Sequence, residues 1–121
     1  MAKQNTSVNI TILGSKWTIK YLDEDPLFEN AQGYTIGPTR EIVIENIKFN
    51  SDDPMVFDLN AQNINQKRVL RHEIIHAYLE ECGLAENSSE TEAWATNEEM
   101  IDWFARIGPK IFETYKELNI L

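Results

Sequence analysis

The stretch His72-Glu73-Ile74-Ile75-His76 decides how the rest of this 121-residue chain is interpreted, because it contains both of the chain's histidines. The apolar residues around it recur at helical spacing, which predicts a helix over about residues 63–82. On a helix, residues i and i+4 lie on one face, so the two imidazoles stack on the same side with Glu73 beside them. Gly83 follows where a C-cap glycine is expected.

Two imidazoles at this spacing can bind one metal ion, and a glutamate beside them can accept a proton from a water on that metal. This is the H-E-x-x-H pattern of zinc hydrolases. The competing interpretation is a chance match on an amphipathic helix, which scattered histidines would produce more readily than the two present here. We therefore predict that His72 and His76 bind Zn²⁺ and that Glu73 is the general base.

Composition indicates one domain over residues 1–121, with 42% hydrophobic and 26% charged residues. The net charge of −9 disfavours nucleic acid and an anionic membrane surface as partners. A cationic or neutral peptide or protein substrate would meet a more favourable field, and the simplest interpretation of the charge is solubility. No apolar run approaches the length of a transmembrane helix, and Met1–Ser7 lacks a signal-peptide pattern. The lone Cys82 cannot form an internal disulfide, so we expect a cytoplasmic protein.

Hydrophobic periodicity and turn residues predict an α+β fold. Glycines and prolines mark residues 23–40 as loop, a capping box at Ser89 opens a second helix, and Gly108-Pro109 ends that helix and starts another. The predicted elements are strands at about 8–13, 16–22 and 41–46, and helices at about 63–82, 90–107 and 109–119. Together they form a small three-stranded sheet packed on the H-E-x-x-H helix, an antiparallel glutamate-bearing helix and a C-terminal helix. Trp94, Ile101 and Phe104 are expected to face inward.

A catalytic zinc site usually has three protein ligands, and no histidine or second cysteine remains to supply the third. A carboxylate on the helix after Gly83 is therefore expected. The candidates are Glu90, Glu92, Glu98 and Glu99. If that helix folds back antiparallel from about residue 89, Glu98 and Glu99 lie at the depth of His76.

Glu98 is preferred over Glu99 and Glu92 as the third ligand because it shares a helix face with Asp102. Their like charges repel unless something positive offsets them, as a metal ion on Glu98 would. Asp102 is then expected to accept the second ring N–H of a ligand histidine, which fixes the tautomer. The alternative for Asp102 is a salt bridge to Arg71 or Arg106.

The pattern His72-Glu73-x-x-His76 followed by Asn97-Glu98-x-x-x-Asp102 resembles that of the gluzincins, the thermolysin-type metallopeptidases. The resemblance implies three zinc ligands, His72, His76 and Glu98, with Glu73 as general base and Asp102 orienting His72. This chain has Ile101 where the gluzincin pattern has serine, a position that is not a ligand.

The size of the chain and the stretch Trp94–Trp103 also resemble a family of short phage- and prophage-encoded proteins with minimal zinc-peptidase-like domains. That resemblance covers most of residues 8–112. It implies the minimal gluzincin fold, a small sheet on two principal helices. It also implies the cytoplasm of the host cell as the location of a phage-derived protein.

These observations predict a zinc-dependent metallopeptidase-like protein that hydrolyses peptide bonds. One departure from the gluzincin pattern matters, because full-sized members add a downstream histidine or tyrosine that stabilises the oxyanion. The candidates to replace it are Tyr34, Arg40, Arg106 and Tyr115. The alternative is a non-catalytic zinc-binding interaction or structural protein of phage or prophage origin, and a third hypothesis is a metal-free protein that retains a relic motif.

Overall fold

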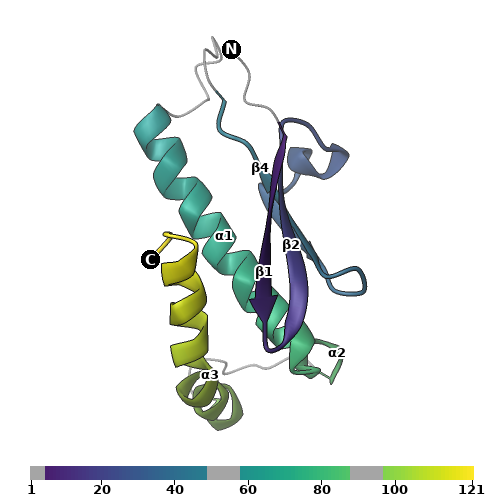
Figure 1. Ribbon diagram of the computed structural model, residues 1–121, viewed down its shortest axis with the longest axis vertical. Coiled ribbons are helices and arrows are strands. Elements are labelled where there is room, and N and C mark those ends of the chain that lie inside the picture. The colour runs from purple at the N-terminus through teal and green to yellow at the C-terminus, as the bar shows by residue number, and fades with distance from the viewer. Residues whose placement is uncertain (1–4, 49–57, 88–96) are drawn as a thin grey trace.

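The computed structural model describes residues 5–48, 58–87 and 97–121 and shows an α+β fold (Figure 1). The elements are β1 (Thr6–Ile12), β2 (Ser15–Leu22), the 3-10 helix η1 (Pro26–Glu29), β3 (Gly33–Ile36), β4 (Glu41–Glu45), α1 (Leu59–Glu81), α2 (Leu84–Asn87) and α3 (Glu98–Glu117). The fold class is as predicted, but the sheet has four strands instead of three. Within the described ranges, every helix falls short of the length and apolar character that crossing a membrane requires.

The strands are ordered β1-β2-β4-β3, so β3 lies at one edge of the sheet. β1 and β2 form an antiparallel hairpin whose two connecting residues, Leu13 and Gly14, both have positive φ. β2 pairs with β4 in parallel, and β3 pairs with β4 antiparallel. The sequence-based assignment of residues 23–40 to loop was wrong for β3, because this strand is only four residues long and begins with glycine.

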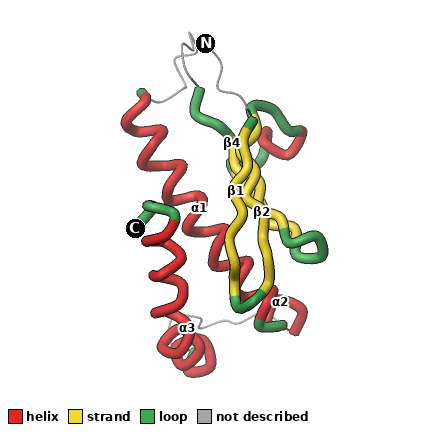
Figure 2. The backbone as a smooth tube through the Cα atoms, viewed as in Figure 1, coloured by secondary structure: helices red, strands yellow, loops and turns green. Residues whose placement is uncertain are grey.

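One face of the sheet is covered by α1, which runs along the strands (Figure 2). Buried side chains alternate along β1 and β2, whereas three consecutive apolar residues of β4 are buried. The fully buried members from the sheet are Ile12, Trp17, Ile19, Ile42 and Ile44. From α1 they meet the buried Val69, Leu70, Ile74, Ala77 and Tyr78.

α1 begins earlier than the sequence indicated. Its N-cap is Asp58, five residues before the predicted start near residue 63, and the Asp58 carboxylate accepts a hydrogen bond from Ala61 N at 2.8 Å. The predicted end is confirmed, because Cys82 caps the helix and Gly83 follows with φ of +74°.

α3 is a single helix through Gly108 and Pro109, which corrects the prediction of two helices. Proline removes one intrahelical hydrogen bond, the one that the carbonyl of Ala105 would accept, and exposed Ala105 leaves that carbonyl near water. Ile101 and Phe104 are 43% and 40% exposed, so the expectation that they face inward was wrong. The expected helix start near residue 90 and Trp94 lie outside the described residues.

β3 and the residue that follows it lie close to α1, because the residues that face the helix at alternate positions are all small. A Cβ placed on Gly33 would lie 2.8 Å from Val69 Cγ1, and one on Gly37 would overlap the carboxylate of Glu80. Between these two glycines Thr35 faces the same helix. The alternation therefore brings the edge strand against α1 along residues 69–80.

We predict that Gly33→Ala destabilises the fold by about 1–3 kcal/mol, because the new methyl group overlaps the stiff Val69 side chain and approaches Val43 O at 3.1 Å. Gly108→Ala is the matched control. Its Cβ would meet Phe104 at an ordinary 3.4 Å, and alanine favours the α3 helix by about 0.5–1 kcal/mol. Urea unfolding of both variants checks the opposite signs, and a Gly33→Ala protein as stable as wild type would contradict the close packing.

The end of α1 is attached to the sheet through the carboxylate of Glu81, whose side chain is 10% exposed. Trp17 Nε1 donates to its Oε1 at 2.8 Å, Arg40 Nε donates to the same oxygen at 2.7 Å, and Ser15 Oγ donates to Oε2 at 3.1 Å. Burial on its own raises the pKa of Glu81, but these hydrogen bonds favour the charged form and lower the pKa overall.

Because the folded-state pKa of Glu81 lies below the ordinary 4.5, this carboxylate stabilises the fold above pH 4.5 and loses that contribution as the pH falls through the folded-state pKa. We therefore expect Glu81→Gln to be less stable than wild type at neutral pH. The gap should narrow once the pH is below that pKa. Thermal unfolding at neutral pH and at a pH below the folded-state pKa measures the stability difference between the two proteins, and Glu24→Gln, at an exposed position, is the control. A gap that is independent of pH would contradict the proposed role of the charge.

Candidate metal centre

His72 and His76 project from the exposed side of α1, and their rings meet edge to face with centroids 4.9 Å apart. The Nε2 atoms of the two rings are 3.2 Å apart. In the absence of a metal one ring can donate a proton to the other, with the direction set by the tautomers. The sequence prediction that both histidines share one face of a helix is confirmed.

The separation of the two nitrogens fits a shared zinc ion. With a Zn–N distance of about 2.05 Å, two nitrogens 3.2 Å apart subtend roughly 100° at the metal, close to the tetrahedral angle that zinc adopts. Imidazole nitrogens are also among the ligands that zinc prefers. The pair can therefore supply two of the three protein ligands of a catalytic site without rearrangement of the helix.

Glu73 lies on the inner side of α1 and is only 6% exposed. Its Oε1 accepts a hydrogen bond from Thr35 Oγ1 at 2.8 Å, and the same hydroxyl lies 3.3 Å from the carbonyl oxygen of Glu73. A buried carboxylate needs such a partner, because burial without one is costly. Glu73 thus sits at the contact between α1 and the edge strand β3, one residue along the chain from His72.

Glu98 and Asp102 are not brought to the histidines. Within the described residues no group of three or more His, Cys, Asp or Glu side chains could hold a metal ion, so Glu98 does not join His72 and His76. The carboxylate of Asp102 instead accepts from Arg106 Nε at 3.0 Å, an exposed pair that corresponds to the alternative considered for this residue. Glu90 and Glu92 lie outside the described residues.

The packing of α3 on α1 explains this separation. Trp103 Nε1 lies 3.5 Å from Cys82 Sγ, and Tyr115 donates to the carbonyl of Arg71 at 3.0 Å, so the two helices run antiparallel. Glu98 is the first residue of α3, five residues before Trp103, so it lies on the part of α3 that approaches the Cys82 end of α1. The depth estimate from sequence assumed a helix start near residue 89, whereas the described helix starts at Glu98.

The two features also lie on different flanks of α1. At 3.6 residues per turn, the α1 residues that contact α3, namely Arg71, Tyr78 and Cys82, lie about 120° around the axis from His72 and His76. The histidines lie instead on the flank next to β3. In the described structure Glu98 therefore does not lie beside the histidine pair, and its role as a zinc ligand stays a prediction from sequence.

The four candidate oxyanion donors are all engaged elsewhere in the structure. Tyr34 donates to Asp25 at 2.8 Å, and burial together with that carboxylate raises the pKa of Tyr34 to about 12. Arg40 binds Glu81 and Arg106 binds Asp102. Tyr115 donates to Arg71 O, and burial raises its pKa.

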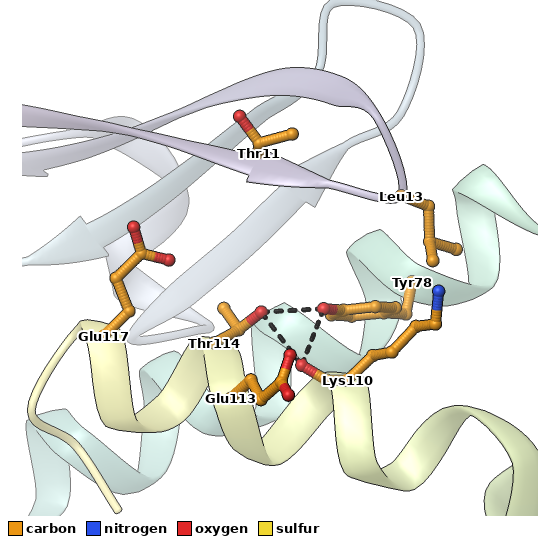
Figure 3. A pocket seen from close by; sticks show the side chains of 7 residues that line it. All are labelled: Thr11, Leu13, Tyr78, Lys110, Glu113, Thr114 and Glu117. Atoms are coloured by element: carbon orange, nitrogen blue, oxygen red, sulfur yellow. Dashed lines mark hydrogen bonds between the residues drawn. The ribbon is translucent and has the colours of Figure 1, made fainter.

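An open depression of about 370 Å³ lies apart from the histidines, between the β1–β2 turn and α3 (Figure 3). Its lining residues are Thr11, Leu13, Tyr78, Lys110, Glu113, Thr114 and Glu117. Tyr78 Oη lies 2.7 Å from Thr114 Oγ1 and donates to Lys110 O at 3.0 Å, so the hydroxyl groups of Tyr78 and Thr114 are already hydrogen-bonded to the protein. This depression is not part of the metal centre.

Thr35 is the residue that the sequence analysis missed. Its signal is the alternation Gly33-x-Thr35-x-Gly37, three small residues at strand spacing that can approach a helix closely.

The chain matches no protein-family model, no curated protein and no solved structure. The resemblance to gluzincins therefore rests on the residues quoted above.

Proposed function

We propose that this protein is a zinc-dependent peptide hydrolase. The observation that carries the proposal is the 3.2 Å separation of His72 Nε2 and His76 Nε2, which matches two ligands of one tetrahedral zinc ion. The buried Glu73 supplies a carboxylate at the sequence spacing of the H-E-x-x-H motif, in which this glutamate is the general base. The third ligand predicted from sequence, Glu98, would have to reach this pair from α3, which in its described position holds it apart from the histidines.

Zinc, when bound, acts as a Lewis acid that lowers the pKa of water to about 7 and polarises a carbonyl group. Thr35 donates its hydrogen bond to Glu73 Oε1, so Oε2 is the carboxylate oxygen that Thr35 does not hold. Oε2 is therefore the atom that accepts the proton of the attacking water. Glu73 then passes that proton to the leaving amine, which completes hydrolysis of the peptide bond.

Among residues 5–48, 58–87 and 97–121 no strand pairs with the outer edge of β3, and this edge offers a place for an extended peptide. Glu45 N donates to Gln32 O at 2.9 Å, so Gln32 and Glu45 form a hydrogen-bonded pair of the β3–β4 ladder. Because such pairs alternate along antiparallel strands, the backbone groups of Gly33 and Thr35 point away from β4. A substrate that pairs with them would pass beside Glu73, which Thr35 contacts.

A non-catalytic zinc-binding interaction protein is the second candidate. The observation that favours it is that each of the four candidate oxyanion donors is hydrogen-bonded elsewhere. Loss of one such donor lowers the rate of acyl transfer by about 10²–10³-fold. A peptide-hydrolysis assay separates the two candidates, because the non-catalytic protein would bind zinc without hydrolysing peptide bonds.

We expect protein purified without chelators to contain about one zinc ion per chain by elemental analysis. His76→Ala should lose most of this zinc, because it removes one of two converging nitrogens. Since metal binding stabilises the folded state, zinc should raise the melting temperature of wild type more than that of His76→Ala. A wild-type protein that takes up no zinc on titration would dispose of the proposal.

Glu98→Ala and Glu99→Ala form a matched pair for the third ligand, because both residues are exposed neighbours in the first turn of α3. A loss of zinc affinity in Glu98→Ala alone would keep Glu98 in the ligand set. Equal affinities in the two variants would remove it.

Glu73→Gln should retain zinc and the fold but lower the hydrolysis rate by about 10²–10⁴-fold, because the amide cannot accept the proton from water. Its carbonyl oxygen can still accept the hydrogen bond from Thr35. The assay uses fluorescently labelled casein with products identified by mass spectrometry, and exposed Glu113→Gln serves as the control. Undiminished hydrolysis by Glu73→Gln would assign the base to another residue.

A further inference from the structure

We propose that Thr35 is a positioning residue that holds the carboxylate of Glu73 in its working orientation. This inference rests on the proposed hydrolase function and deepens it, because it assigns a role to a residue outside the H-E-x-x-H motif. Thr35 donates to the proposed base and belongs to a different element of the fold, the edge strand β3.

The contact has the geometry of a direct hydrogen bond. Thr35 Oγ1 lies 2.8 Å from Glu73 Oε1, a distance typical of a hydroxyl donating to an oxygen acceptor. The hydroxyl also lies 3.3 Å from the carbonyl oxygen of Glu73, so it reaches both the side chain and the backbone of that residue. Among the contacts of the described residues, the Thr35 hydroxyl is the one hydrogen-bond donor to the Glu73 carboxylate.

Thr35 can hold the Glu73 carboxylate in this orientation because three features of the structure restrict the position of its own side chain. Its backbone is in register with Ile42 of β4, and its β-branched side chain has few rotamers. Gly33 and Gly37 on either side let the strand approach α1 without a methyl group in the way. The hydroxyl therefore reaches Glu73 from a rigid element, which is what positioning of a catalytic group requires.

The consequence for the carboxylate is that its two oxygens have different roles. Oε1 is held by Thr35, which leaves Oε2 to accept a proton. Without the hydroxyl, Glu73 could rotate about its last torsion, which is broad for glutamate. The base would then spend less time in the orientation that the reaction needs, and misplacement of a reacting group by about 1 Å can lower the rate 10²-fold.

The test compares Thr35→Val, which removes the hydroxyl at constant shape, with Thr35→Ser, which retains it. Thr35→Ala is added because the smaller side chain admits water to the buried carboxylate and so tolerates the loss of the bond better. Thr18→Val is the matched control, since Thr18 donates to Asn9 at 3.0 Å on the same sheet. Each protein is measured for zinc content, for kcat and KM on labelled casein, and by crystallography of the zinc-loaded form.

We expect Thr35→Val and Thr35→Ala to bind zinc as wild type does, with kcat lowered about 10- to 100-fold and KM changed less than about twofold. Thr35→Ser should recover kcat to within about threefold, and Thr18→Val should match wild type. Crystals should show Glu73 in one orientation in wild type and Thr35→Ser, and rotated or in two conformers in the Val and Ala variants.

An unchanged kcat in zinc-loaded Thr35→Val or Thr35→Ala would overturn the positioning role while the hydrolase function stands. A wild-type protein that binds zinc but hydrolyses nothing would instead overturn the function. In that event the crystal structures decide alone whether Thr35 orients Glu73. An identical carboxylate orientation with and without the hydroxyl would refute it.

Discussion

The close approach of β3 to α1 is the constraint on which the site depends. Small residues at positions 33, 35 and 37 let an edge strand lie against residues 69–80 of the helix. This contact buries Glu73 and supplies its hydrogen-bond donor, while His72 and His76, on the neighbouring flank, remain exposed. A strand with larger residues on this side would lie farther from the helix. The Glu73 carboxylate would then be exposed to solvent or buried without a hydrogen-bond donor.

α1 therefore carries two kinds of residue that its periodicity keeps apart. Leu70, Ile74 and Ala77 enter the core between helix and sheet, and their burial fixes how the helix is rotated. That rotation sets the direction of the histidines. The carboxylate of Glu81 holds the end of the same helix through donors from β2 and the turn before β4, so the helix is held both along its length and at its end.

The parts of the fold that could be predicted from sequence are those with a strong repeating pattern. Alternation predicted β1 and β2, a short apolar run rich in β-branched residues predicted β4, and the helical repeat with Gly83 at its end predicted most of α1. β3 was missed because its function in packing selects glycines, which otherwise indicate loop. Gly108 and Pro109 suggested a helix break, yet α3 continues because Gly108 is buried and the unpaired carbonyl before the proline lies at an exposed turn.

The metal centre was predictable to the extent that it is local in sequence. His72, Glu73 and His76 lie within one helical turn, so their relative placement follows from helix geometry alone. Glu98 depends on how a second helix packs, and that packing follows from contacts such as Trp103 with Cys82 and Tyr115 with Arg71. These contacts place α3 on the flank of α1 away from the histidines. An acidic ligand that completes a three-ligand site must therefore approach from the side where β3 and the histidines lie, and α3 in its described position does not reach that side.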